Sequence, residues 1–511
     1  MHYIIGVDIG TTSTKAVGFD LQGHVLAENS IAYPLLTPQP EYSEQDPDAV
    51  FRAVRDTIKA VTAAVGATGF TKAGLGGISF SSAMHSLILM DADGKPLTNS
   101  ITWADTRSKE YATQIKNSAV GHDIYRKTGT PVHPMSPLCK LVWLQARQPD
   151  LMRQAFKFIS IKEYIFYQFF GQYVIDYSLA SATGLFDIFA LNWYAPALDL
   201  AGISAAALSE PKPGTHVVKG LSRNEANYLG VDMRVPFILG GSDGCLANLG
   251  SNAIQPGQAA LTIGTSGAIR VISPQAATDE QERIFSYILT PQHYVLGGPV
   301  SNGAVVLQWF LDQFGGPEKQ LAQDRNTDAY ELLLQKAAAI PAGAEGLLFL
   351  PYLLGERAPV WDANARGVYF GLNLTHTRDH MLRALLEGIL FNLYSVAQAL
   401  TQITGPIEVL YANGGFAKGD IWVQMLADIF NKQVLVTETV ESAALGAAIM
   451  GMLALGYIPD FNAVEKLVPV GKTYVPDPAQ HTVYQQLFTV YENLYPQLKA
   501  DFARIAALQS A

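Results

Sequence analysis

The chain has 511 residues, of which 49% are hydrophobic and 16% are charged, and its formal net charge is −10 at pH 7. A single hydrophobic core stops growing at about 250–300 residues, so this length predicts two domains. The acidic balance argues against a nucleic-acid partner, because proteins that coat nucleic acid are normally basic. The two cysteines, Cys139 and Cys245, are too few for a disulfide framework or a zinc site.

The first residues, MHYIIGVDIG, lack the basic start and the apolar segment of a signal peptide. No unbroken apolar run approaches 18 residues, so no membrane span is predicted. The apolar stretch 443–455 contains two glycines and is expected to form a buried helix. These features favour a cytoplasmic protein that does not act at a membrane.

The first thirty residues predict an antiparallel meander with strands at 3–8, 15–20 and 25–31. A helix follows, because Asp46 can cap it, Pro47 suits its first turn, and apolar residues recur at helical spacing from Val50 to Val61. Strands are then expected at 75–80 and 85–90. Hairpinned strands followed by alternating helices and strands predict a mixed sheet with helices around it.

The second half of the chain begins in the same way, with strands expected at 258–263 and 268–272. The turns at 9–12 and 263–266 share the pattern Ile-Gly-Thr-(Thr/Ser), each between two strands. This repeated context indicates a distant internal duplication. We place the boundary near residues 244–256 and predict domains 1–246 and 247–511.

Both turns are candidates for phosphate binding. A turn dense in Gly, Thr and Ser offers backbone N–H groups and hydroxyls to phosphate oxygens. Asp8, at the end of the strand before the first turn, can hold Mg²⁺ through water. Each turn alone fits an ordinary hairpin about as well. As a pair, one in each domain, the turns predict a grip on a triphosphate from both sides of a cleft.

Asp243 lies in the segment Gly240–Gly244, directly after the apolar stretch 235–239. Phosphoryl transfer to a hydroxyl needs a group that orients the nucleophile and accepts its proton, and a carboxylate at a strand end between glycines suits this task. Taken alone, the segment fits a turn aspartate that bonds its own backbone better.

A second glycine-containing turn, 411–420, joins the expected strand 407–410 to an apolar-faced helix. Glycines after a strand let a flat adenine approach the backbone. Alone, this turn is better explained as a tight strand-to-helix connection.

Candidate sugar-binding residues lie in otherwise apolar segments: His85, Trp103, Asp105 and Arg107. Sugars are bound by planar polar groups on their hydroxyls and by an aromatic ring on their C–H face. Each of these residues, taken singly, is more often structural: a core histidine, a core tryptophan, or a surface Asp–Arg pair.

Together with the segment Gly355-Glu356-Arg357-Ala358-Pro359, these motifs span residues 3–456 and resemble the carbohydrate kinases that include glycerol kinase, xylulokinase and gluconokinase. The resemblance implies an α/β protein with two ribonuclease H-like (actin-like ATPase) domains around a central cleft. The N-terminal domain is expected to bind the sugar and the C-terminal domain ATP. The implied reaction is in-line transfer of the γ-phosphoryl group of MgATP to a sugar or sugar acid.

The resemblance also assigns expected roles. Asp243 is implied as the catalytic base in contact with the substrate, and Asp8 as the residue that places Mg²⁺. The implied sugar contacts are Met84, His85, Trp103 and Asp105. The implied ATP contacts are Gly10, Thr11, Thr12, Ser13, Lys15, Gly264, Thr265, Gly303, Gln308, Gly414 and Gly415.

Within the family, several phrases resemble gluconokinases, so D-gluconate is the first expected acceptor and 6-phosphogluconate the product. These phrases are SSAMHS (81–86), TWADTRS (102–108), TGTPVHPM (128–135), IKEYIF (161–166) and DYSLASATG (176–184). Met84-His85 departs from the glycerol kinase pattern and also resembles xylulokinases. A xylulokinase or another kinase of open-chain pentoses or polyols is therefore the alternative. Arg107 and Arg357 are both candidates to meet a substrate carboxylate.

An actin- or chaperone-like ATPase is the alternative from another class, because such proteins use the same two hairpins. The residues past 456 are too few for a client-binding domain, however, and Asp105 and Asp243 would then have no substrate. An idle sugar sensor should have lost Asp243 or Asp8. The segment with Tyr484 and Tyr491 predicts an amphipathic helix that packs on the body of the protein, with packing on a second subunit of a homodimer left open.

Overall fold

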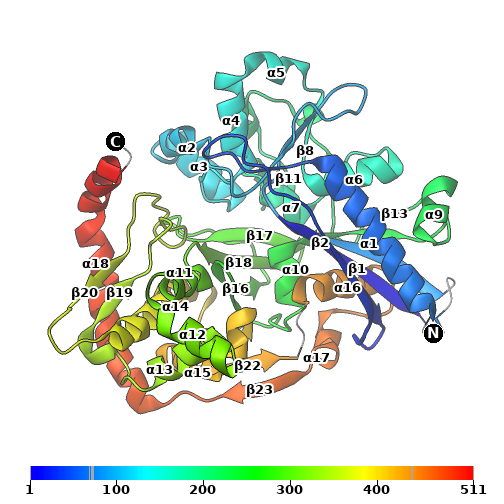
Figure 1. Ribbon diagram of the computed structural model, residues 1–511. Coiled ribbons are helices and arrows are strands. Elements are labelled where there is room, and N and C mark those ends of the chain that lie inside the picture. Colours follow the sequence, from blue (N-terminus) through cyan, green and yellow to red (C-terminus); the bar gives the residue numbers. More distant parts are fainter. Residues whose placement is uncertain (1, 68, 71–73, 439–440, 510–511) are drawn as a thin grey trace. The chain divides into compact units, whose positions relative to one another are not determined.

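The computed structural model describes residues 2–67, 69–70, 74–438 and 441–509 (Figure 1). The chain forms two compact units, and each is assembled from separate stretches of sequence. The first unit comprises Met1–Ile254, Ile272–Leu296 and Glu441–Pro469. The second unit comprises Gln255–Val271, Gly297–Val440 and Val470–Ala511. The predicted domains 1–246 and 247–511 stay a prediction.

The first unit is built on a six-stranded sheet with the order β13-β14-β5-β1-β2-β3. β1 pairs antiparallel with β2, and the neighbours β1, β5 and β14 run parallel. Because the carboxyl ends of parallel strands meet at one edge of a sheet, residues that follow these strands come together there. The strands are β1 (Tyr3–Ile9), β2 (Ser13–Asp20), β3 (Val25–Ala32), β5 (Leu75–Ser82), β13 (Val217–Val218) and β14 (Phe237–Ser242).

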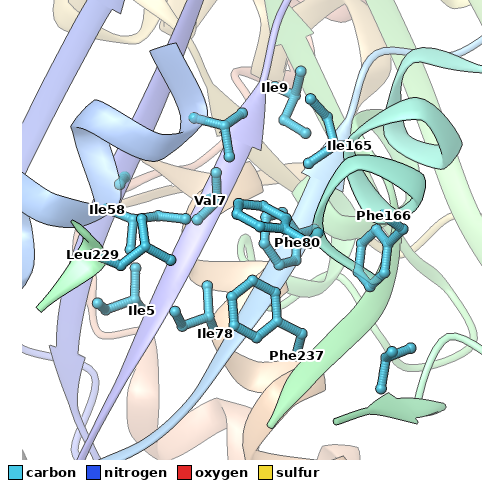
Figure 2. Packing of buried hydrophobic residues seen from close by; sticks show 14 of the residues in the cluster. Ile5, Val7, Ile9, Ile58, Ile78, Phe80, Ile165, Phe166, Leu229 and Phe237 are labelled. Atoms are coloured by element: carbon cyan, nitrogen blue, oxygen red, sulfur yellow. The ribbon is translucent and has the colours of Figure 1, made fainter. Parts of the chain in front are cut away.

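Both faces of the central strand β1 are buried. Ile5, Val7 and Ile9 alternate along β1 and pack with Phe80 and Phe237 in a core that helices α1 (Pro47–Ala67) and α6 (Ile161–Phe170) complete (Figure 2). Ile4, on the opposite face of β1, belongs to a second core with helix α16 (Ser442–Ala454). Burial on both faces explains why β1 is almost continuously apolar.

Helix α16 comes from the far end of the sequence and lies against β1, β5 and α10 (Asp243–Leu249) (Figure 1). Glycine permits this contact: a Cβ at Gly6 would lie 2.0 Å from the carbonyl oxygen of Ala444. The predicted buried helix at 443–455 is thus confirmed, and it completes the core of the first unit.

The remaining elements of the first unit surround the sheet. The helices are α2 (Lys109–Lys116), α3 (Ala119–Thr128), α4 (Pro137–Arg147), α5 (Pro149–Gln154), α7 (Tyr177–Ser181), α8 (Ala195–Ala201), α9 (Arg223–Leu229) and α17 (Val464–Leu467). The short strands are β4 (Glu44–Gln45), β6 (Ile88–Met90), β7 (Ser100–Ile101), β8 (Lys157–Ile159), β9 (Val174–Asp176), β10 (Phe186–Asp187), β11 (Asn192–Trp193) and β12 (Glu210–Lys212). Strand β17 (Phe285–Thr290) also belongs to this unit, and β18 (His293–Val300) follows it.

The second unit repeats the beginning of the first. β15 pairs antiparallel with β16, with Ile263 opposite Gly267, and β15 pairs parallel with β21, which pairs parallel with β22. The strands are β15 (Gln258–Ile263), β16 (Gly267–Ser273), β19 (Leu348–Leu350), β20 (Val368–Phe370), β21 (Val409–Asn413), β22 (Gln433–Thr437) and β23 (Val470–Tyr474). The helices are α11 (Ala304–Phe314), α12 (Gly316–Arg325), α13 (Ala329–Ala338), α14 (Arg378–Thr404), α15 (Asp420–Phe430) and α18 (Pro478–Gln509).

Helix α14 is the one helix among the described residues that is long and apolar enough to cross a membrane by length and composition. Its apolar window is 78% buried inside the protein, and it packs against α13, α15 and β19. It is therefore the core helix of the second unit. The C-terminal helix α18 lies on it: Arg383 donates to the Tyr484 hydroxyl at 2.6 Å, and Tyr491 is buried. The predicted packing of this helix on the body is confirmed.

The predicted strands of both hairpins are confirmed as β1, β2, β15 and β16, and the predicted first helix as α1. The strand expected at 85–90 is wrong at its start, because β6 begins only at Ile88. His85 instead has a left-handed backbone with φ 67°. The Lys140 ammonium holds the His85 carbonyl at 2.5 Å, and the chain turns there instead of extending.

Candidate active site

Two carboxylates lie at the carboxyl edge of the first unit's sheet, at the ends of β1 and β14, which are separated by β5. Asp8 is near the end of β1, and Asp243 is the first residue of α10, directly after β14. Ser81 on the intervening strand β5 donates to Asp8 Oδ1 at 2.7 Å. Burial and the charge of Asp243 raise the pKa of Asp8 to about 6. The site thus concentrates negative charge that a cation would neutralise.

Asp243 is half-buried, and its conformation is fixed by the start of its helix. Ser242 caps α10 by accepting from Cys245 N, and the Ser178 hydroxyl lies 2.8 Å from the Ser242 hydroxyl. Asp243 Oδ1 accepts a hydrogen bond from Gly244 N at 2.7 Å. The turn-aspartate interpretation of this residue therefore describes part of its bonding.

The first hairpin tip has its carbonyl groups bound within the protein. Tyr33 donates to Gly10 O at 2.8 Å, Gln45 donates to Thr11 O at 2.8 Å, and Tyr33 N donates to Thr12 O. Gly10 N closes the turn on Ser13 O at 2.9 Å. Because all four carbonyls already accept hydrogen bonds, the tip can present N–H and hydroxyl groups to an anion.

Tyr33 and Gln45 were missed by the sequence analysis. Both contact the hairpin from later segments, β4 in the case of Gln45, so no local motif links them to it.

Lys15 lies opposite Asp8 on β2. Its ammonium is 2.8 Å from Glu441 and 3.4 Å from Glu28. Here the predicted phosphate ligand is paired with two carboxylates of the same unit.

The structure places His85 in the interior of the first unit. Its Nδ1 lies 2.7 Å from Ala182 O, and its Nε2 lies 3.5 Å from the Tyr287 hydroxyl. A carbonyl can only accept, so Nδ1 carries a proton and donates it to Ala182 O. Met84 is partly buried against the neighbouring core. Tyr287, on the distant strand β17, was missed because nothing in its local sequence marks it.

Trp103 and Asp105 have different surroundings. The Trp103 indole donates to Thr11 Oγ1 at 2.9 Å, which joins a predicted sugar residue to the first hairpin. Asp105 is fully buried, and both of its oxygens are bound by Arg107, at 2.8 Å from Nε and 2.6 Å from Nη2. Arg107 also bonds Glu44 at 2.5 Å and is therefore already surrounded by carboxylates.

The second hairpin is bound by the start of α11. Ala304 N donates to Gly264 O at 2.7 Å, and Gly303 N and Val305 N donate to Thr265 O, each at 3.2 Å. A Cβ at Gly303 would lie 2.6 Å from the carbonyl carbon of Ser266. Glycine at this position allows the hairpin and the helix to meet.

A cavity of about 690 Å³ opens beside this hairpin within the second unit. Four predicted ATP contacts line it: Gly264, Thr265, Gln308 and Gly415. Gly414, next to this wall, has a left-handed backbone with φ 95°. Residues missed by the sequence analysis complete the wall, among them Tyr330, Leu334, Phe416 and Trp422. The helical spacing of Tyr330 and Leu334 was the available signal, but it is also typical of an ordinary core face.

The segment around Glu356 holds the loop that precedes α11, next to the second hairpin. Glu356 is buried and accepts from Ser301 N at 2.5 Å and from Asn392 at 2.8 Å. Arg357 donates to Val300 O at 2.9 Å. The two residues thus hold the loop that leads into Gly303 and α11.

No group of three or more His, Cys, Asp or Glu side chains within residues 2–67, 69–70, 74–438 and 441–509 is arranged to hold a metal ion. Asp8 and Asp243 make a two-carboxylate site instead. Such a site suits Mg²⁺, which keeps several waters and takes its other ligands from phosphate oxygens.

Two units that each begin with a glycine-containing hairpin have the ribonuclease H-like fold of the actin-like ATPases, which carbohydrate kinases share. Models of the FGGY family of carbohydrate kinases match the chain, the N-terminal domain over residues 3–250 and the C-terminal domain over residues 259–455. The chain belongs to this family, whose kinases use ATP.

Individual relatives cover nearly the whole chain. It is 46% identical over 510 residues to a gluconokinase of Bacillus subtilis (99% of this chain, 98% of the relative) and 31% identical over 502 residues to a xylulose kinase of the same species (98% of each). Two solved structures from Lactobacillus acidophilus, a gluconate kinase and a ligand-bound xylulose kinase, each match with a TM-score of 0.93 and 38% identity. Both matches cover 99% of this chain. They cover 99% of the gluconate kinase and 100% of the xylulose kinase.

Proposed function

We propose that this kinase phosphorylates D-gluconate with ATP and that the product is 6-phosphogluconate. The observation that carries the proposal is the identity of 46% to gluconokinases from two Bacillus species, against 31% to xylulose kinases over a similar length. D-Xylulose is the second candidate acceptor, because the gluconate kinase and xylulose kinase structures match the chain equally well.

Asp243 is proposed as the base. The acceptor hydroxyl gives its proton to the Asp243 carboxylate while its oxygen attacks the γ-phosphorus. The new O–P bond forms as the bond from phosphorus to the ADP oxygen breaks. The hydrogen bond from Gly244 N holds the carboxylate in place, and its position after β14 puts it at the edge where the other strand-end residues gather.

Asp8 is proposed to hold Mg²⁺. Burial and the charge of Asp243 raise the pKa of Asp8 to about 6, so a bound cation would favour its ionised form. Bound Mg²⁺ would neutralise negative charge on the transferring phosphoryl oxygens. The Ser81 hydroxyl keeps the Asp8 carboxylate oriented toward the site.

ATP binding is proposed to use both hairpins. The tip at Gly10–Ser13 offers N–H and hydroxyl groups because its carbonyls are already bound. Lys15, next to the tip, is proposed to exchange its partners Glu28 and Glu441 for phosphate oxygens when ATP binds. In the second unit, Gly264 and Thr265 are proposed to bind phosphate, and the cavity bounded by Gln308 and Gly415 the adenosine.

The acceptor is proposed to lie against Met84, His85 and Trp103. A substrate hydroxyl is proposed to take the place of the Tyr287 hydroxyl beside His85 Nε2, and the ring of Trp103 to cover a C–H face. Arg107 is neutralised by Asp105 and Glu44, so we assign it to holding this segment and not to the substrate carboxylate. We likewise assign Asp105 to holding this segment through Arg107. A cytoplasmic location and a homodimer stay expectations.

The acceptor is tested by ADP release in a coupled assay with D-gluconate, D-xylulose, L-ribulose, L-fuculose and glycerol, and the product is identified by ³¹P NMR. Turnover with gluconate far above the other sugars is expected. Highest turnover with D-xylulose would replace the acceptor but keep the kinase. Equal ATP hydrolysis with and without any sugar would overturn the proposal in favour of an actin-like ATPase.

A further inference from the structure

Lys140 is a fully buried lysine that the mechanism above does not use. It lies on α4, and its Nζ donates to three backbone carbonyls: His85 O at 2.5 Å, Thr102 O at 2.8 Å and Ile101 O at 3.3 Å. An ammonium has three N–H donors, so donors and acceptors match in number. One of the carbonyls belongs to His85 and another directly precedes Trp103. A single side chain thus joins the two segments that carry the proposed acceptor contacts.

We propose that Lys140 is a positioning residue for the acceptor site, fastening the backbone at His85 to the backbone at Ile101–Thr102. The proposal rests on the proposed function, which places the acceptor against these segments. Trp103 in turn donates a hydrogen bond to Thr11, so the segment that Lys140 holds is also linked to the first hairpin. His85 has a left-handed backbone that a non-glycine residue adopts only at a cost, and the bond to its carbonyl helps to hold it there.

A second buried lysine shows what is distinctive about Lys140. Lys162 on α6 also donates to two carbonyls, those of Leu239 and Gly241 before Asp243, but its ammonium lies 2.6 Å from the Asp176 carboxylate. The three acceptors of Lys140 are all neutral carbonyls. Burying a charge with dipoles alone is costly, and Lys140 lacks the directly bound carboxylate that favours the charged form of Lys162.

Burial lowers the pKa of both buried lysines. Burial lowers the pKa of Lys140 to about 7, opposed by the charge of Asp105 and assisted by that of Arg107; the Cys139 thiol also faces it. The neutral amine has two N–H donors and a lone pair, so one of the three carbonyls loses its partner. As the pH rises through about 7, the hydrogen bonds from Lys140 to the three carbonyls should weaken. The segments of the acceptor site should then become mobile at a pH at which the ATP site is still ordered.

The test compares Lys140→Met, Lys140→Arg and wild type, with Lys157→Met as the matched control. Lys157 also donates to two carbonyls, Ala206 O and Leu208 O, but joins segments outside the proposed site. Lys140→Met is expected to raise KM for the acceptor at least tenfold and KM for ATP less than twofold, and Lys157→Met to change neither. In wild type, KM for the acceptor should rise above pH 7; in Lys140→Met this dependence should disappear.

Lys140→Arg keeps a charge and several N–H donors that do not titrate in this range, so it should restore part of the acceptor affinity and make it independent of pH. If Lys140→Met does not fold, Lys140→Arg and the pH profile of the wild type are used to test the proposal. An equal loss of affinity for both substrates, or a pH dependence that survives in the variants, would overturn the proposal. The assays use whichever acceptor gives the highest turnover, so an error in the choice of gluconate is detected separately in the acceptor panel.

Discussion

The two glycine-containing hairpins share a sequence pattern, yet the structure supports them differently. At Gly10–Ser13 the carbonyls of the first two residues are bound by the side chains of Tyr33 and Gln45, and the strand before the tip carries Asp8. At Gly264–Ser266 the carbonyls of the first two residues are bound by the backbone N–H groups of the segment Gly303–Val305, and a cavity of about 690 Å³ opens beside the tip.

This difference indicates that the two hairpins have different functions. The first hairpin is held by side chains and lies in the unit that contains Asp8 and Asp243. The second hairpin is held by backbone N–H groups at the start of α11 and borders a cavity that is large enough for a nucleotide. Changes near the first hairpin should therefore affect chemistry and pH dependence, and changes near the second should affect nucleotide affinity.

The largest effect is expected for Asp243→Asn, which keeps the shape of the side chain but removes the base. Loss of a general base typically costs about 10²–10⁴ in rate, so kcat should fall by this factor while binding of ATP changes little. Coupled ADP release and ATP titration calorimetry measure the two quantities. Asp232→Asn, which alters an exposed aspartate paired with Arg234, is the control and should retain full activity. A variant with kcat near wild type would remove Asp243 from the chemistry.

Asp8→Asn should combine a loss of activity with a gain in stability. The pKa of Asp8 is about 6 in the folded protein and near 3.8 otherwise, so the folded state binds the proton more tightly. Folding stability therefore falls as the pH rises from about 4 to 6, and Asp8→Asn avoids this loss. Two pKa units correspond to about 3 kcal/mol, an upper estimate for the gain at pH 7 without metal. Denaturant unfolding with EDTA at pH 4 and 7 measures it.

The same pKa predicts how activity depends on pH and Mg²⁺. Below pH 6 Asp8 is protonated and should hold the cation poorly, so turnover should decline on the acid side. Because Mg²⁺ favours the ionised carboxylate, more Mg²⁺ should move this decline to lower pH. Mg²⁺ should also stabilise wild type and not Asp8→Asn. An acid limb that is indifferent to Mg²⁺ would contradict the assignment of the metal to Asp8.

The hairpin pattern predicted much of what these experiments address, for a physical reason. Strand alternation and the Gly-Thr-rich tips are local features, so β1, β2, β15 and β16 could be located from the sequence. The position of Asp243 after an apolar strand was likewise visible. The strand order β14-β5-β1, which brings Asp243 and Asp8 to one edge, was not.

What the sequence analysis missed depends on distant contacts. Tyr33, Gln45, Tyr287 and Lys140 carry no local signal, because each acts through a carbonyl or a ring far away in the sequence. Asp105 and Arg107 were correctly seen as a pair, but the complete burial of Asp105 was not foreseen. Nor was the return of α16 into the core of the first unit, which depends on close approach at Gly6.

Gly303→Ala tests the backbone support of the second hairpin. The added Cβ would meet the Ser266 backbone at 2.6 Å, where nothing flexible can move aside. We expect KM for ATP to rise about tenfold or more, with KM for the acceptor changed less than twofold. Gly316→Ala, where a Cβ meets no atom within 4 Å, is the control in the same unit and should be neutral. A rise in KM for the acceptor alone would contradict the division between the two hairpins.

Tyr33→Phe should give the smallest effect, and it asks whether side-chain support of the first hairpin matters for function. The change removes the donor to Gly10 O at 2.8 Å, but Gln45 still reaches this oxygen at 3.2 Å. Because a partner remains, we expect a loss of about 1 kcal/mol in stability and a two- to threefold rise in KM for ATP. Tyr294→Phe, which removes a hydroxyl that donates to Pro291 O, is the matched control and should leave KM unchanged. If both variants lose stability equally but neither alters KM, the hydroxyl of Tyr33 contributes to folding alone, and the tuning of the first hairpin must come from Gln45.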